Sequence, residues 1–250
     1  CYTNILQILD LAQIPLLAKD RDWGYPIVIG GGPCAYNPEP IADFFDLFYI
    51  GEGETVYFDL LDVYQKCRKE GRSRHEFLIA AAKIPGIYVP MLYDVTYKED
   101  GTIASFMPNV LDIPEKIEKQ IVMDLTESYY PKAPVVPFIK ATQDRVVLEI
   151  MRGCIRGCRF CQAGMLYRPT RERDLEMLKR TALEMLKNTG HEEISLSSLS
   201  SSDYRSLNEL VTFLIEECNR RGVNISLPSL RIDAFSLDVM SKVQDVKKSS

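Results

Sequence analysis

Hydrophobic and polar positions in the first 70 residues alternate in a way that predicts an αβ unit. Apolar residues recur at helical intervals over residues 5–12, up to Pro15, which ends or kinks a helix. The following apolar run at residues 27–29 lies between a proline and a set of glycines and predicts a buried strand. The next predicted elements are a helical turn, a strand and an amphipathic helix, at residues 40–45, 47–50 and 55–69. This pattern is typical of half of a doubly wound, Rossmann-like sheet.

Residues 71–144 lose this alternation, because prolines interrupt short strand-like stretches such as residues 86–89. Asp100-Gly101 lies between two β-prone stretches and predicts a hairpin turn. We therefore expect a first domain over residues 1–70 and a linker over residues 71–144 that wraps it onto the next domain.

From residue 145 to residue 250 the sequence predicts three successive pairs of strand and helix. The expected strands are residues 146–151, 193–197 and 224–227, and the expected helices are residues 171–188, 203–221 and 236–246. Gly190 and Gly222 are placed to end the first two helices. Three βα units in a row predict a parallel α/β barrel or open sheet, whose chemistry lies at the carboxyl ends of its strands.

Composition narrows the class of protein. Of the 250 residues, 46% are hydrophobic and 26% are charged, and the net charge is −5, which excludes a disordered chain and a globally basic nucleic-acid binder. No apolar run approaches the about 20 residues needed to cross a bilayer, and the first residues lack the pattern of basic, apolar and small residues that is typical of a signal peptide. We expect a cytoplasmic protein without a membrane partner. Because the chain begins at Cys1 rather than at methionine, we also expect a fragment.

Three of the seven cysteines, Cys154, Cys158 and Cys161, form a C-x3-C-x2-C run directly after the strand at residues 146–151. An odd number of cysteines in a reducing compartment favours a metal site over a disulfide framework. Three thiolates can bind three irons of a 4Fe-4S cluster and leave the fourth iron open to a small molecule. A structural zinc site is the alternative, but zinc requires a fourth ligand, and neither His75 nor His191 is well placed to supply it.

The cysteine spacing, the aromatic Phe160 before the third cysteine, and the position after a strand resemble the radical S-adenosylmethionine (SAM) superfamily. The resemblance implies that Cys154, Cys158 and Cys161 bind a 4Fe-4S cluster. It also implies that SAM chelates the open iron and is reductively cleaved to a 5′-deoxyadenosyl radical, with Phe160 near the adenine. An electron donor such as flavodoxin or ferredoxin is implied as a partner.

Further SAM ligands are expected after the second and third strands. Members of the family commonly place a glycine-rich motif ending in Glu after the second strand, where this chain has a serine-rich stretch that includes Ser198. These serines could hold the methionine amino group, or Asp203 could simply cap the next helix. Ser229-Leu230-Arg231 resembles the pattern by which some relatives place an arginine against the SAM carboxylate. The alternative is an ion pair of Arg231 with Asp233 or another acid.

Gly30, Gly31 and Gly32, together with the motif at residues 46–54, resemble the second half of the cobalamin-binding domain that precedes many radical SAM domains. Glycines after a strand admit close approach of a bulky ligand, although a generic αβ turn would need them too. Cobalamin domains that coordinate cobalt through a histidine carry an Asp-x-His-x-x-Gly loop, and this sequence has none. We therefore expect an α/β chain with a partial cobalamin-type domain and the first three βα units of a partial TIM-type radical SAM barrel.

Substrate and reaction remain open at this stage. A cobalamin-dependent methyltransferase fits the glycines, whereas an RNA-modifying, methylthiotransferase-like enzyme fits the arginines of residues 152–180, which a solvated helix face would also explain. A methylthiotransferase would need a second cluster, and the other cysteines are not grouped to bind one. A non-catalytic scaffold that binds zinc is the alternative from a different class of protein.

Overall fold

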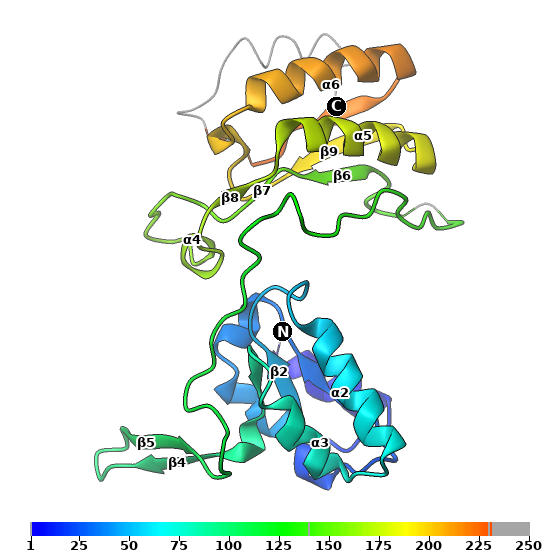
Figure 1. Cartoon of the computed structure of the whole chain (residues 1–250). Helices are drawn as coiled ribbons and strands as arrows, with labels where there is room; N and C mark the ends of the chain where they lie inside the picture. The colour runs from blue at the N-terminus through cyan, green and yellow to red at the C-terminus, as the bar shows by residue number, and fades with distance from the viewer. Residues whose placement is uncertain (1, 140, 230, 232–250) are drawn as a thin grey trace. The chain divides into compact units, whose positions relative to one another are not determined.

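The computed structural model describes residues 2–139, 141–229 and 231 and divides the chain into two compact units, Cys1–Val122 and Met123–Ser250. Both units combine helices with strands (Figure 1), so the predicted α/β class is confirmed. Among the described residues, no helix is long and apolar enough to cross a membrane.

The first unit contains a three-stranded sheet in the order β1-β2-β3, in which β1 is parallel to β2 and β3 is antiparallel to it. The strands are β1 (Ile29–Gly30), β2 (Leu47–Tyr49) and β3 (Ile87–Tyr88), and the helices are α1 (Tyr2–Leu11), α2 (Tyr57–Lys69) and α3 (Arg74–Ala81). The short turn expected at residues 40–45 is the 3₁₀ helix η3 (Glu39–Phe44). Phe48, Leu60 and Phe77 form part of the core of this unit.

Helix α3 lies inside the segment predicted to be a linker. It begins with a capping box, in which the Ser73 backbone N–H donates to the Glu76 carboxylate at 2.8 Å and the Glu76 N–H donates to the Ser73 hydroxyl at 3.2 Å. Phe77 and Leu78 then enter the core. The structure places the end of the first compact unit at Val122, within residues 71–144.

A buried carboxylate joins β2 to α3. Asp46, which is 2% exposed, accepts hydrogen bonds from the Val28 N–H at 2.7 Å and from Arg74 at 2.8 Å. Its carboxylate also lies 3.3 Å from the guanidinium of Arg21, which donates to the Phe44 carbonyl. Within the described part of the chain, Asp46 Oδ1 and the Nε atoms of both arginines are buried without a hydrogen-bond partner. A single oxygen of Asp46, Oδ2, therefore lies within 3.3 Å of both guanidinium groups.

The hairpin predicted around Asp100-Gly101 is present as β4 (Tyr93–Tyr97) and β5 (Ile103–Pro108). Gly101 has a φ of +79°, a left-handed conformation that glycine adopts without strain. The Asp100 carboxylate accepts hydrogen bonds from the backbone and side chain of Thr102. The turn prediction is therefore confirmed.

The second unit contains a parallel sheet whose order β6-β9-β10 follows the order of the chain. Its strands β6 (Val146–Glu149), β9 (Glu193–Ser197) and β10 (Asn224–Ser226) confirm the three predicted strands. Helices α5 (Leu175–Thr189) and α6 (Leu207–Arg221) pack side by side against the sheet (Figure 1). Gly190 and Gly222 end them with φ values of +70° and +68°, as expected.

Two predicted helices begin later than expected. Arg171–Glu172 forms β8, which pairs with β7 (Met151–Arg152), and the Asp174 carboxylate caps α5 by accepting from the Met177 N–H at 2.8 Å. Residues Ser201–Asp203 form the 3₁₀ turn η5, so the interpretation of Asp203 as the cap of the next helix is wrong. The helix expected at residues 236–246 and the acid Asp233 lie outside the described residues.

The free edge of β6 is covered by a tyrosine side chain. The Tyr130 hydroxyl donates to the Val147 carbonyl at 2.9 Å and accepts from the Glu149 N–H at 2.7 Å. The guanidinium of Arg173 lies 4.6 Å from the centroid of the Tyr130 ring. One hydroxyl therefore satisfies a donor and an acceptor that a neighbouring strand would otherwise pair.

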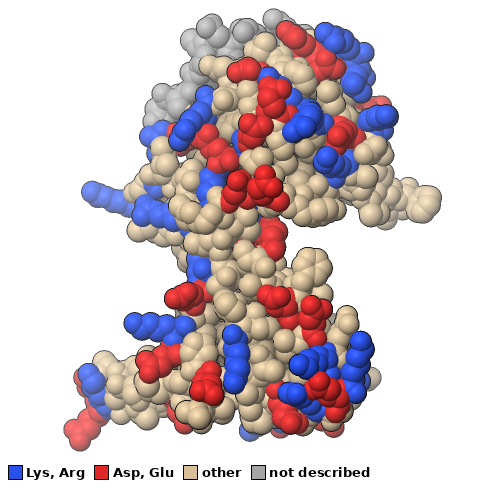
Figure 2. Space-filling view, viewed as in Figure 1, with Lys and Arg blue, Asp and Glu red and all other residues tan. Residues whose placement is uncertain are grey.

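Acidic and basic side chains are interspersed on the face of the molecule seen in Figure 2. Three arginines within residues 152–180 form ion pairs with acids of the same unit: Arg152 and Arg173 bind Glu149, and Arg156 binds Asp203. The interpretation of this segment as a solvated helix face therefore does not hold for these three arginines.

Candidate functional site

The three clustered cysteines lie on one loop, residues 153–170, which follows β7 at the carboxyl end of the parallel sheet. The pairing of β7 with β8 closes the base of this loop, and the short helix α4 (Ala163–Leu166) lies within it. Cys154 and Cys158 are partly exposed and Cys161 is exposed, and none of the three forms a disulfide. The loop therefore carries three thiols that are available as ligands.

Two glycines allow the loop to fold tightly. Gly153 has a φ of +85°, and a Cβ there would lie 2.7 Å from the carbonyl oxygens of Tyr167 and Pro169. A Cβ on Gly164 would lie 2.8 Å from the carbonyl oxygen of Arg156. Backbone approaches of this kind exclude any side chain at these two positions.

Replacing Gly153 by alanine is expected to destabilise the second unit by on the order of 1–3 kcal/mol, because a strained φ and backbone contacts act together. Urea unfolding would measure the loss. Gly157→Ala is the matched control, since Gly157 lies in the same loop, lacks a positive φ and has no atom within 4 Å of a Cβ. Equal unfolding midpoints for the two variants would contradict this account of the loop.

An ion pair ties the cysteine loop to the segment after β9. Arg156, between the first two cysteines, donates from Nε to Asp203 Oδ2 at 3.0 Å and from Nη2 to Asp203 Oδ1. The Asp203 side chain is only 6% exposed, and the hydrogen bonds from Arg156 lower the pKa of its carboxyl group. The Arg156 backbone N–H also points at the sulfur of Cys154 at 3.4 Å.

The segments after β9 and β10 are joined by hydrogen bonds of the serine-rich stretch. The Ser201 hydroxyl lies 2.9 Å from that of Ser198 and donates to the Pro228 carbonyl, also at 2.9 Å. The Ser229 carbonyl accepts from the Ser201 N–H at 3.2 Å, and the Arg231 N–H donates to the Ser202 hydroxyl at 3.1 Å. Ser198, Ser229 and Arg231 are thus brought to one edge of the sheet, while Leu230 lies outside the described residues.

The charge of Arg231 contributes to the lowered pKa of Asp203, after the larger effect of Arg156. Asp203 is thus a candidate for the acid in the alternative interpretation of Arg231, in which this arginine forms an ion pair instead of binding SAM. Phe160 is 93% exposed on the cysteine loop, so its ring is accessible to a ligand. A cavity of about 390 Å³ next to the loop is lined by Ile155, Asp203 and Arg205, among other residues.

The donor set of the loop fits an iron-sulfur cluster in its chemistry, because three unpaired thiols stand on eight consecutive residues. Among the described residues, no three His, Cys, Asp or Glu side chains are grouped as metal ligands. Cluster binding therefore requires the three thiols to converge.

Glu149 binds an arginine on each side of the cysteine loop, a role that the sequence did not predict. Its carboxylate accepts from Arg152 at 2.8 Å and from the buried Arg173 at 2.7 Å. Burial alone would raise the pKa of Glu149, but the hydrogen bonds from the two arginines hold it below its usual value. The signal available in the sequence was a single acid inside an otherwise apolar strand.

The glycines of the first unit have different roles. Gly30 lies inside β1, where a Cβ would be 2.4 Å from the ring of Phe48, so packing alone requires a glycine there. Gly31 and Gly32 follow the strand, and a Cβ on either would meet no atom closer than 3.9 Å. Gly51 packs against the backbone of Gln120, and a Cβ at Gly51 would lie 2.3 Å from the carbonyl oxygen of that residue.

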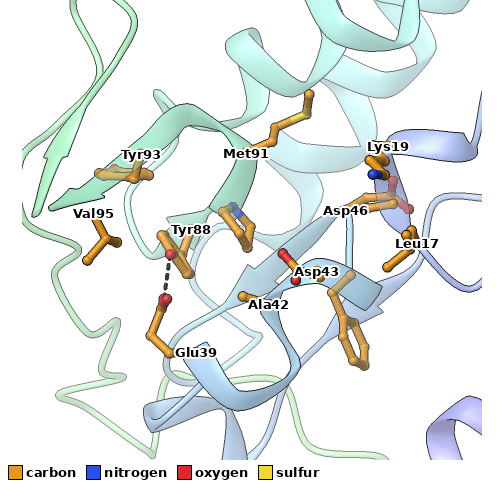
Figure 3. A pocket seen from close by; sticks show the side chains of 13 residues that line it. Leu17, Lys19, Glu39, Ala42, Asp43, Asp46, Tyr88, Met91, Tyr93 and Val95 are labelled. Carbon is orange, nitrogen blue, oxygen red and sulfur yellow. Dashed lines mark hydrogen bonds between the residues drawn. The ribbon is translucent and has the colours of Figure 1, made fainter. Parts of the chain in front are cut away.

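A second cavity, of about 360 Å³, lies beside the start of β2 (Figure 3). The Tyr88 hydroxyl donates to Glu39 at 2.5 Å on its wall, and Asp43 and Asp46 also line it. Burial is the main cause that raises the pKa of Tyr88. This cavity is at the amino end of β2. Gly31 and Gly32, by contrast, follow the carboxyl end of β1, and Gly51 follows the carboxyl end of β2.

Two sequence models cover most of the chain. Residues 148–248 match the Radical SAM superfamily, and residues 1–90 match the amino-terminal region of radical SAM proteins. The chain therefore contains a radical SAM domain, preceded by a domain of the kind found at the amino terminus of such proteins. Membership of this family implies a 4Fe-4S cluster and SAM as cofactors.

Among individual relatives, the chain is 31% identical over 217 residues to the uncharacterized protein MJ0966 of Methanocaldococcus jannaschii, covering 86% of the chain and 40% of that protein. The structure of the radical SAM methyltransferase TsrM from Kitasatospora setae, with cobalamin and a [4Fe-4S] cluster bound, is 16% identical with a TM-score of 0.45. That match covers 86% of this chain and 40% of TsrM.

The cobalamin-dependent SAM radical enzyme OxsB is also 16% identical, with a TM-score of 0.47 over 90% of this chain and 27% of OxsB. The chain thus spans less than half the length of each of these three proteins.

Proposed function

We propose that the second unit binds a 4Fe-4S cluster through Cys154, Cys158 and Cys161 and uses it to cleave SAM reductively. The observation that carries this proposal is the set of three free thiols on one loop at the carboxyl end of β6, inside a radical SAM domain. When bound, the cluster would supply the electron that breaks the sulfonium bond of SAM.

The proposal gives the neighbouring residues separate roles. The guanidinium of Arg231 suits the SAM carboxylate, because a planar fork of donors matches two carboxylate oxygens. The hydroxyls of Ser198 and Ser229 would hydrogen-bond the amino group and the nearby polar atoms of the methionine part. Phe160 would pack near the adenine once SAM covers its exposed ring.

For the fold, we propose that β6, β9 and β10 are the first strands of a partial TIM-type barrel. Their spatial order follows their order in the chain, as it does in a singly wound barrel. The parallel pair β1 and β2 supports the Rossmann-like interpretation of the first unit, while the antiparallel β3 departs from it.

Anaerobic reconstitution with iron and sulfide tests the proposed activity. The expected result is a brown protein with about four irons per chain, which releases 5′-deoxyadenosine from SAM after chemical reduction. A colourless protein that binds zinc tightly and leaves SAM intact would overturn the proposal in favour of a zinc-binding scaffold.

A second candidate function is cobalamin-dependent methyl transfer, which the open space at Gly31 and Gly32 favours. Two histidines lie among the described residues, His75 on α3 and His191 before β9, and both are far from these glycines in the sequence. We therefore expect that the residues around Gly31 and Gly32 would supply no histidine ligand to cobalamin. Titration with hydroxocobalamin would show a shifted absorption spectrum if the proposal holds, and an unchanged spectrum would remove it.

The remaining cysteines do not favour a methylthiotransferase. Cys67 and Cys218 are buried in the cores of different units, and burial raises the pKa of the Cys218 thiol to about 11. RNA as a substrate and flavodoxin or ferredoxin as the electron donor stay predictions from the sequence.

A further inference from the structure

The cavity at the amino end of β2 combines acidic and aromatic side chains, and neither proposed function uses it (Figure 3). Of the described residues that line it, three are acids and one is a base: Glu39, Asp43, Asp46 and Lys19. Three aromatic rings also line it, those of Phe45, Tyr88 and Tyr93. Small-molecule sites span about 300–1,000 Å³, and this cavity, with about 360 Å³, lies near the lower end of that range. It therefore has the size of a site for a small ligand.

Asp46 contributes a buried acceptor that lacks a donor. Its side chain is 1% exposed, and its Oδ2 lies 2.8 Å from Arg74 and 3.3 Å from Arg21, neither of which lines the cavity. Within the described part of the chain, Oδ1 of Asp46 has no hydrogen-bond partner. Nearly all buried polar atoms of native proteins have a partner, so an unused oxygen in a residue that lines a cavity indicates a place for a donor from a ligand.

A tyrosine fixes a second carboxylate on the wall of the cavity. The Tyr88 hydroxyl donates to Glu39 Oε1 at 2.5 Å, as the dashed line in Figure 3 shows. Burial raises the pKa of Tyr88, so this hydroxyl keeps its proton and Glu39 remains the acceptor. The hydrogen bond uses Oε1 and leaves Oε2 of the exposed Glu39 for a donor in the cavity. Asp43, which is drawn between Glu39 and Asp46 in Figure 3, adds a third carboxylate.

We propose that this cavity binds a small organic cation, with a primary ammonium group at the carboxylates and an apolar body against the aromatic rings. An ammonium group carries three N–H donors, and the faces of aromatic rings attract cations. In the part of the chain that the structure describes, no three His, Cys, Asp or Glu side chains are grouped as metal ligands, which favours an organic cation over a metal ion. Such binding is independent of the proposed cluster, because the cavity lies in the first unit.

Isothermal titration calorimetry of the full chain with benzylammonium chloride tests the proposal, and benzyl alcohol is the neutral ligand of similar shape. We expect saturable binding of benzylammonium and about tenfold weaker binding of the alcohol, which lacks the charge. Asp43→Asn and Glu39→Gln should each weaken the binding of benzylammonium by about tenfold. Asp62→Asn, which removes an exposed acid of α2 that does not line the cavity, is the matched control.

Lys19→Met tests the sign of the charge that the cavity accepts. Because this change removes a like charge from the wall, we expect benzylammonium to bind more tightly to the variant than to the unsubstituted chain. Weaker binding to the variant would contradict the proposal, and tighter binding of benzoate than of benzylammonium would overturn it in favour of an anionic ligand.

Equal binding of benzyl alcohol and benzylammonium would overturn the proposal in favour of a purely apolar cavity. The absence of saturable binding by either compound would overturn it as well. Urea unfolding midpoints of the variants without ligand separate lost binding from lost folding. None of these titrations requires a cluster, so their outcome leaves the proposed function of the second unit untouched.

Discussion

Cys158→Ala is expected to remove the visible absorbance of the reconstituted cluster and to abolish release of 5′-deoxyadenosine. With only two thiols left on the loop, a cubane would expose two irons instead of one, and its binding would be lost. Iron and sulfide content after anaerobic gel filtration measures the effect. We expect the iron content of this variant to fall to the background of untreated protein.

Cys34→Ala is the matched control, because Cys34 is an exposed free cysteine that lies in the other unit. It should keep the iron content and the SAM cleavage of the unsubstituted chain. Retention of a full cluster by Cys158→Ala would refute the assignment of Cys158 as a ligand. Loss of the cluster in both variants would point to general oxidation sensitivity rather than to ligation.

Asp46→Ala is expected to destabilise the first unit by about 3–5 kcal/mol, because it leaves two buried guanidinium groups without their shared anion. The carboxylate joins the Val28 backbone, Arg21 and Arg74, so the residues just before β1 and β2 and the start of α3 would all lose a contact. Urea unfolding followed by the fluorescence of Trp23, which lies in this unit and donates to the Arg72 carbonyl, reports the change.

Asp43→Ala serves as the control, since it removes an exposed carboxylate that lies three residues earlier, within the 3₁₀ helix η3. Exposed substitutions of this kind usually change stability by less than about 0.5 kcal/mol. A similar loss in the two variants would mean that the buried cluster contributes little to the fold.

The strands of the second unit could be predicted from the sequence because their signal is local. Residues 193–197 form a short apolar and polar run bounded by turn residues, and β9 has these bounds. Helix α3 lies in a segment predicted to be a linker, although Ser73 and Glu76 form a capping box, because the helix has only 8 residues and prolines follow it at positions 85 and 90. The helices α5 and α6 begin later than expected because residues 171–172 pair with β7 and residues 201–203 form the 3₁₀ turn η5, whose Asp203 binds Arg156 from a distant part of the chain.

In the candidate site, too, residues close together in the sequence could be predicted, whereas contacts between distant residues could not. The cysteine triad could be found because the chemistry of the loop lies within eight residues. The partner of Arg156 is 47 residues away, and Glu149 binds Arg173 across 24 residues, so both contacts appear only once the sheet has formed. Ser198, Ser229 and Arg231 were selected by resemblance, and the structure supplies the backbone hydrogen bonds that bring them together.

The tyrosine on the free edge of β6 also bears on solubility. Unpaired strand edges recruit strands from other molecules and promote aggregation. The Tyr130 hydroxyl occupies one donor and one acceptor of this edge, and its ring holds Arg173 beside them. A single phenol therefore removes one donor and one acceptor of β6 from those that a strand of another molecule could pair with.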